Sequence, residues 1–195
     1  LIGVFQSHFH KTPEETWTNY SDTFRAKSTP IITPDFLAAL AQAESSGNPI
    51  VRTYWRFKMT TDWDQIYAPA SSAVGMFQIT KGTFDEARRF CIKDGRVRYE
   101  APGSGDGCWG NMIYSRLVPS HAIEMTSARL HHHVERIRET HARRRRVSLR
   151  DQQSLATIIH LCGVGKGEQF ARVGFNAGRI GRCGDHSASG YVQKI

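Results

Sequence analysis

Apolar side chains recur at helical spacing along much of this 195-residue chain. In the clearest segment, Thr33 is suited to cap a helix and Pro34 to occupy its first position. Phe36 and Leu40 then mark one apolar stripe, and the Gly-Asn-Pro sequence at 47–49 is typical of a helix end. We therefore predict an amphipathic helix that begins after Thr33 and ends before residue 47.

An acidic side chain falls on the inner face of this predicted helix. Glu44 lies in the last turn, four residues after Leu40, and shares its stripe. A carboxyl group facing inward is expected to hold a proton, because burial disfavours the charged form. A protonated carboxyl group is a candidate general acid. The alternative is an ordinary solvated glutamate at a helix end.

Other segments carry the same periodicity. It predicts further helices over 83–92, over 119–141, from a capping box at 148–151 onward, and from Glu168 to the end of the apolar pattern near Phe175. The glycine-rich stretch 163–167 matches no phosphate-binding motif and is expected to end a helix.

Length and an apolar content of 39% fit one main globular domain. We assign residues 33–195 to this domain and residues 1–32 to an N-terminal arm, in which Thr12 and Pro13 are suited to open a short helix. No apolar run approaches the ~18 residues of a membrane span. No export leader is recognisable at the N-terminus, so an exported protein would be represented here in mature or trimmed form.

The chain is basic, with 26 Lys and Arg against 18 Asp and Glu. Such a balance favours anionic polymers as partners. The run Arg143–Arg146 is either a solvated connector between helices or a contact for such a polymer. No aromatic residues alternate with it and no nucleic-acid motif is present, so we expect no nucleic-acid partner.

The four cysteines and the histidine tract are the residues from which metal binding and disulfide formation can be judged. The cysteines contain no Cys-x-x-Cys pair, and successive helical residues such as His131–His133 point in different directions, so neither metal nor cofactor is expected. Of the possible disulfide pairings we favour the local one, which indicates an oxidising compartment. Four reduced core cysteines are the alternative. The favoured pairs are Cys91–Cys108 and Cys162–Cys183.

Four short motifs occur in a fixed order: ESSGNP at 44–49, SSAVGMFQIT at 71–80, GFNAG at 174–178 and YVQKI at 191–195. Together they resemble the ES..NP, G.MQ, AYNAG and late Tyr-Val pattern of the soluble lytic transglycosylases (SLT). The resemblance covers roughly residues 33–195. It implies a mainly α, lysozyme-like fold with a cleft between a helical lobe and a smaller, loop-rich lobe.

The resemblance also implies the site residues. Glu44 is the expected catalytic residue, Gln78 and either Ser71 or Ser72 would orient N-acetyl groups, and Tyr191 would bond Glu44 or the sugar. Phe77 and Phe175 stand where the family usually has Met and Tyr, which alters the expected cleft wall. The expected substrate-binding set is therefore Ser71, Ser72, Phe77, Gln78, Phe175, Asn176 and Tyr191.

The activity implied is cleavage of peptidoglycan glycan strands without water, with Glu44 acting as acid and then as base to leave 1,6-anhydro ends. Hydrolysis of peptidoglycan or chitin by a lysozyme-type enzyme, and a non-catalytic wall-binding or secretion-scaffold role, are the alternatives. A periplasmic or outer-membrane-associated protein is expected, with secretion-system or cell-wall proteins as further partners. The long spacing from Glu44 to Gly75 predicts an insertion whose aromatic residues, Tyr54 to Tyr67, either stack on sugars or pack onto the domain.

Overall fold

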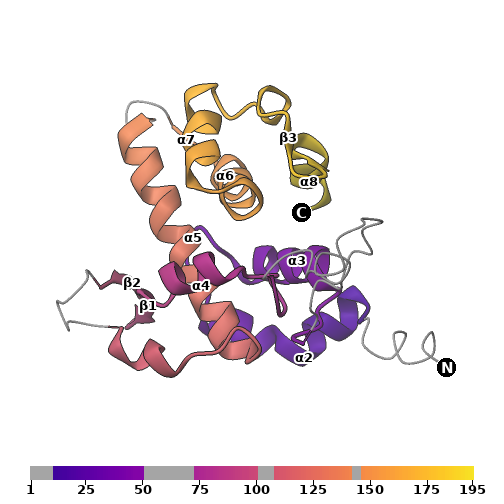
Figure 1. Cartoon of the computed structure of the whole chain (residues 1–195), viewed down its shortest axis with the longest axis vertical. Coiled ribbons are helices and arrows are strands. Elements are labelled where there is room, and N and C mark those ends of the chain that lie inside the picture. Colours follow the sequence, from indigo (N-terminus) through magenta and orange to yellow (C-terminus); the bar gives the residue numbers. More distant parts are fainter. Residues whose placement is uncertain (1–10, 51–72, 101–107, 142–145) are drawn as a thin grey trace, which may run out of the picture.

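The computed structural model describes residues 11–50, 73–100, 108–141 and 146–195 (Figure 1). These parts contain seven α-helices, two 3-10 helices and two short antiparallel hairpins. The predicted mainly α class is therefore confirmed. None of the described helices has the combination of length and apolar character that a membrane crossing needs. The predicted aromatic insertion, Ser71, Ser72 and Arg143–Arg145 lie outside the described residues.

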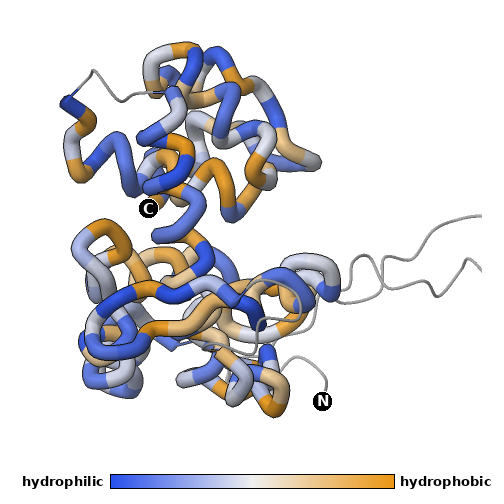
Figure 2. The backbone as a smooth tube through the Cα atoms, turned by 90° about the vertical axis from the view of Figure 1, so that its left-hand side faces the viewer, coloured by the Kyte–Doolittle hydropathy of each residue, from blue (hydrophilic) through white to orange (hydrophobic). Residues whose placement is uncertain are grey.

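The elements form two groups that one long helix joins. Helix α5 (Pro119–His141) contacts α2, α4 and the first hairpin toward one end and α6 and α7 toward the other. Figure 1 shows α5 running between these groups, and Figure 2 shows them again from a view turned by 90°, with apolar stretches in each. The bounds of α5 are those predicted, and its predicted inward residues, Ile123, Leu130, Val134 and Ile137, are buried.

Helix α3 (Pro34–Ser45) forms as its sequence predicts. The Thr33 side chain accepts a hydrogen bond from the Phe36 amide, and Ser46 ends the helix in the left-handed conformation. Leu37 and Leu40 are fully buried in the main core. Burying each such side chain contributes about 1.5–3 kcal/mol relative to leaving it in water. Hydrophobic burial therefore fixes which face of α3 is turned inward.

Helix α2 (Pro13–Ala26) begins at the predicted cap. The Thr12 side chain and Glu15 form a reciprocal capping box. The helix packs on α3, where the Thr16 hydroxyl donates to Gln42 Oε1 at 2.8 Å. Phe24 is fully buried in the same core as α3. This segment is thus attached to the helix that carries Glu44.

The predicted helix over 83–92 is wrong in its second half. Helix α4 (Lys81–Ala87) ends early, and β1 (Phe90–Lys93) pairs with β2 (Arg96–Tyr99). Asp94 and Gly95 both adopt positive φ in the two-residue turn, which is the conformation that Asp-Gly favours in hairpins. Glu124 of α5 also accepts the Ile92 amide at 3.0 Å. Strand pairing and this tertiary contact override the helical spacing.

The C-terminal group corrects a second prediction. Helix α6 (Leu149–Cys162) starts at its predicted cap, but the next helix, α7 (Val164–Arg172), begins earlier than predicted and stops before Phe175. Gly167 lies inside α7, where a side chain would overlap that of Ile159. Close packing of α6 and α7 therefore explains why residue 167 is glycine, while Gly163 ends α6 as predicted.

The remaining elements surround the chain's C-terminal end. The 3-10 helices are η2 (Trp109–Ile113) and η3 (Ala177–Arg179), and a small hairpin joins β3 (Arg182–Cys183) to β4 (His186–Ser187). Helix α8 (Ala188–Lys194) follows directly, in a segment where the sequence patterns predicted no helix. Both favoured disulfides are present, Cys91–Cys108 and Cys162–Cys183, which confirms the local pairing.

Three buried side chains of α5, those of Glu124, Arg129 and His133, are paired with other elements. Glu86 of α4 accepts hydrogen bonds from Arg129 Nε at 2.6 Å and from His133 Nε2 at 2.8 Å. Partial burial raises the pKa of Glu86, but the bond from His133 and the charge of Arg129 outweigh that effect and hold the pKa at about 2. This cluster links α4 to α5 only while Glu86 is ionised.

Acid should therefore weaken the fold through Glu86. Because its pKa is lower in the folded state than its ordinary 4.5, its contribution is complete above pH 4.5 and is lost as the pH falls toward about 2. We expect Glu86→Gln to flatten the pH dependence of the free energy of unfolding over this window, as measured by urea titration. The exposed Glu139→Gln should follow the wild-type curve, and identical curves for all three proteins would contradict the assignment.

Candidate active site

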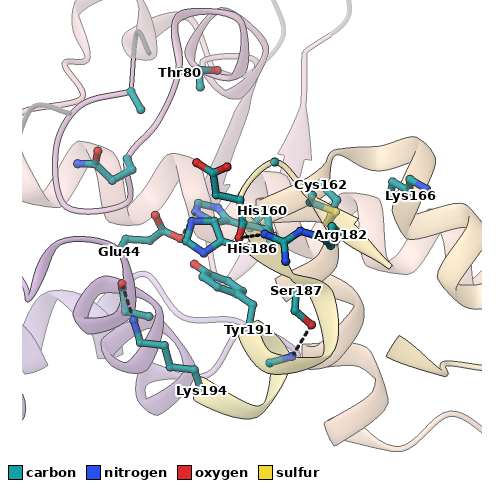
Figure 3. A pocket seen from close by; sticks show the side chains of 18 residues that line it. Glu44, Thr80, His160, Cys162, Lys166, Arg182, His186, Ser187, Tyr191 and Lys194 are labelled. Carbon is teal, nitrogen blue, oxygen red and sulfur yellow. Dashed lines mark hydrogen bonds and ion pairs between the residues drawn. A yellow bond between two sulfur atoms is a disulfide. The ribbon is translucent and has the colours of Figure 1, made fainter. Parts of the chain in front are cut away.

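A pocket of about 890 Å³ lies where the two groups of elements meet. One wall comes from the end of α3 and the segment 73–80, and the other from the α6–α7 junction, the β3–β4 hairpin and α8. Figure 3 shows the side chains that line it, with Glu44, His160, His186 and Tyr191 gathered near the centre. The residues expected near one another from distant motifs, Glu44, Gln78 and Tyr191, thus line one pocket.

Glu44 enters the pocket from the last turn of α3. Its side chain is only 15% exposed, and its Oε1 lies 3.5 Å from Nε2 of His160, whose side chain is 10% exposed. The next residue fixes the backbone: the Ser45 hydroxyl is 2.8 Å from the Met76 carbonyl and 3.2 Å from that of Ala41. Ser45 therefore serves backbone groups. Its bonds tie the end of α3 to the segment that carries Gln78.

The segment 73–80 presents Gln78 to the pocket. Val74 and Ile79 form a bridge, and Gln78 closes the turn between them with a positive φ of 47°. Its side-chain Nε2 donates to the Gly75 carbonyl at 2.9 Å. A positive φ in a residue other than glycine is strained and is often found at functional sites. Phe77, in contrast, is fully buried in the core and does not line the pocket.

Tyr191 reaches the pocket from α8. The residue is 7% exposed, and its hydroxyl has no hydrogen-bond partner within the described part of the chain. The ring of His186 packs edge-on to the ring of Tyr191, with centroids 5.8 Å apart. Lys194 Nζ donates to the Ala43 carbonyl at 3.2 Å and so joins α8 to the end of α3. A buried hydroxyl without a partner is costly, and a ligand in the pocket would satisfy it.

Basic groups outnumber acidic ones in the pocket wall. Lys166, Arg182 and Lys194 line it together with the two histidines, against the carboxyl groups of Glu44 and Asp185. Arg182 is held by a 2.6 Å bond to the Asp185 carbonyl. The pocket is thus suited electrostatically to a substrate that carries carboxylates.

Two expected residues are placed elsewhere. Phe175 packs edge-on against Phe170, with ring centroids 5.5 Å apart, and Asn176 caps η3 by accepting from the Gly178 amide at 3.0 Å. Neither lines the pocket. They lie in the segment between α7 and β3, which is not part of the lining.

His160 was not identified from the sequence. It occupies the last turn of α6, two residues before a disulfide cysteine, but an isolated histidine near a helix end has many ordinary explanations. Only the tertiary structure, which brings the end of α6 near the end of α3, reveals its position beside Glu44.

The histidine tract of α5 is placed outside this pocket. Its members point to different partners: His131 bonds Thr29, His132 stacks on Tyr99, and His133 bonds Glu86. Across the described residues, no group of three or more His, Cys, Asp or Glu side chains is placed to hold a metal ion. The tract therefore serves packing between α5 and its neighbours.

The family model described as "Transglycosylase SLT domain" matches residues 22–149. The chain therefore belongs to the SLT family, which comprises lysozyme-like, lytic transglycosylase-type enzymes of the peptidoglycan cell wall. No curated protein and no solved structure matches the chain. The matched region includes Glu44 and Gln78, whereas His160, His186 and Tyr191 follow it.

Substitution of Gly75 tests whether the segment 73–80 packs closely against the backbone at Arg116. A side chain there would overlap the Arg116 carbonyl, whereas Gly95, which also has positive φ, faces open space. We expect Gly95→Ala to cost about 1 kcal/mol of unfolding free energy from backbone strain, and Gly75→Ala to cost roughly 2–4 kcal/mol because the overlap is added. Urea unfolding measures both, and equal losses would contradict the close approach.

The two disulfides provide a matched comparison. They span similar separations of 17 and 21 residues, so each should contribute about 3 kcal/mol in the chain-entropy model. Only Cys162 and Cys183 line the pocket. We expect both double Cys→Ala variants to lose similar stability, but only the Cys162/Cys183 variant to lose most of its cell-wall-cleaving activity at a temperature where both remain folded. Equal activities, or free thiols in the unreduced wild type, would contradict this.

Proposed function

We propose that this protein is a peptidoglycan lytic transglycosylase in which Glu44 acts first as acid and then as base. The observation that carries the proposal is the position of Glu44, which is nearly buried at the junction of two helix ends in a pocket that Gln78 and Tyr191 also line. Membership of the SLT family supplies the substrate class.

The proposed reaction has two steps. Protonated Glu44 donates its proton to the oxygen that joins C1 of N-acetylmuramic acid to the next N-acetylglucosamine, and the C1–O bond breaks. The N-acetyl carbonyl of the muramic residue stabilises the positive charge at C1. The C6 hydroxyl of the same residue then attacks C1, and the Glu44 carboxylate takes its proton. A 1,6-anhydro ring results, the proton count balances, and no water is consumed.

The other pocket residues have proposed roles in binding. Gln78 offers an amide to an N-acetyl group, and the hydroxyl of Tyr191, which has no hydrogen-bond partner among the described residues, offers a hydrogen bond to a sugar hydroxyl. Ser71 and Ser72 stay predictions for the same N-acetyl contacts. The positions of Phe77, Phe175 and Asn176 away from the pocket give no support to a direct role in binding, so we leave them out of the proposed site.

The charge of the pocket supports a peptidoglycan substrate. The stem peptides attached to N-acetylmuramic acid carry free carboxylates. Lys166, Arg182 and Lys194, which lie along the pocket wall, can attract them. Attraction of this kind is expected to weaken as salt is added.

Hydrolysis is a second candidate because of one specific observation. Asp185 lines the same pocket as Glu44, and inverting glycosidases use a second carboxylate to activate water. In that case the same bond would be cleaved, but the new ends would carry one more water than anhydro ends.

The proposed location is outside the cytoplasm. The SLT family acts on the cell wall, and the two disulfides fit an oxidising compartment. We propose a periplasmic or outer-membrane-associated enzyme, with secretion-system or cell-wall proteins as its partners.

Replacement of Glu44 tests the proposal. Glu44→Gln keeps the side-chain shape but removes the transferable proton, so turnover should fall by at least ~100-fold while the folded state persists. Release of soluble fragments from purified cell walls measures turnover, and mass spectrometry should find wild-type products with anhydro ends.

The matched control is Glu139→Gln, which changes the same residue type at an exposed position of α5. It should cleave as the wild type does. Normal activity in Glu44→Gln would refute the catalytic role, and hydrolysed ends from the wild type would favour the second candidate.

A further inference from the structure

His160 forms an ion-pair contact with Glu44. Its Nε2 lies 3.5 Å from Glu44 Oε1, and within the described part of the chain no other basic side chain is within ion-pair distance of Glu44. The two side chains are 10% and 15% exposed, so water screens their interaction weakly. Figure 3 shows both within the pocket that Tyr191 also lines.

The backbones that carry the two residues are held from both sides. The Ser45 hydroxyl bonds the Met76 carbonyl beside Glu44, and the Cys162–Cys183 disulfide follows His160 by two residues. Lys194 also joins α8 to the end of α3 through the Ala43 carbonyl. The pair is therefore set by the tertiary structure and does not depend on two exposed side chains meeting by chance.

Other titratable or charged groups line the same pocket, and several of them contact residues other than Glu44. Lys194 bonds a carbonyl of α3, Arg182 bonds the Asp185 carbonyl, and His186 packs on the Tyr191 ring. Lys166 is 3.1 Å from Gln169 Oε1. The groups facing the pair are Lys166 from α7, Arg182, Asp185 and His186 from the β3–β4 hairpin, and Tyr191 and Lys194 from α8.

We propose that His160 is a positioning residue for Glu44, an inference that rests on the proposed function. The imidazole Nε2–H donates to Oε1, so that Oε2 is the oxygen that gives and takes the proton. After the first step the same hydrogen bond stabilises the Glu44 carboxylate until the C6 hydroxyl returns a proton. The 3.5 Å distance shortens when a glycan strand excludes water, as hydrogen bonds in unliganded active sites commonly do.

Two substitutions separate this role from a merely structural one. His160→Leu removes the donor, and we expect kcat to fall roughly 10- to 100-fold with little change in KM, because a hydrogen bond to a charged group is lost. His160→Gln retains an N–H donor near the position of Nε2, so it should recover most of kcat at the optimum pH. A merely structural role would not predict this recovery, because Leu and Gln both remove the imidazole ring and only Gln keeps the donor.

The control is His141→Leu, an exposed histidine at the end of α5, which should match the wild type. Initial rates on purified glycan strands across pH, with product masses and thermal unfolding for each variant, form the experiment. A kcat for folded His160→Leu within twofold of wild type, or a folded His160→Gln no better than His160→Leu, would overturn the inference. If His160→Leu does not fold, a folded His160→Gln whose kcat is more than tenfold below that of the wild type overturns it.

A different experimental result would refute the proposed function. Wild-type products without anhydro ends would refute the transglycosylase reaction whatever the His160 variants do. Anhydro products from the wild type, together with unaltered His160 variants, would refute only the positioning role.

Discussion

The attachment of the last turn of α3 is the constraint on which the site depends. Hydrophobic burial of Leu37 and Leu40 turns the helix inward, and the Ser45 hydroxyl then ties its end to the Met76 carbonyl. Glu44 is thereby directed into a pocket where its carboxyl group is largely removed from water. A carboxyl group in such a location can contact a bound ligand directly, which is what the proposed role of Glu44 requires.

The pocket exists because α5 carries both groups of elements. Its buried polar residues bind partners in one group, as Arg129 and His133 do with Glu86, while its apolar residues pack on α6 and α7 in the other. The wall opposite Glu44 is closed covalently by Cys162–Cys183, which holds the β3–β4 hairpin against the end of α6. The site therefore draws on segments far apart in the sequence, and its geometry follows from how those segments pack.

Local sequence patterns correctly predicted those helices whose caps and apolar spacing lie within the helix itself. The caps at Thr33 and Ser148 and the long apolar stripe of α5 predicted three helices whose starts the structure confirms, because caps and periodicity act within a few residues. Where tertiary contacts compete, the patterns failed. The hairpin at Asp94-Gly95 replaced a helical ending, although that dipeptide was a usable signal. In the glycine-rich stretch Gly163 ends α6 as predicted, but the residues after it form α7, which packs closely on α6 at Gly167.

The sequence by itself predicted the mainly α class, favoured the local disulfide pairing, and made Glu44 a candidate through a helix-end position and the order of four motifs. Only the tertiary structure decided which distant residues share the pocket with it. It placed Gln78 and Tyr191 there, left Phe175 and Asn176 outside, and brought in His160. The physical reason is that a side chain's neighbours across a pocket are set by the packing of whole helices, which no local spacing records.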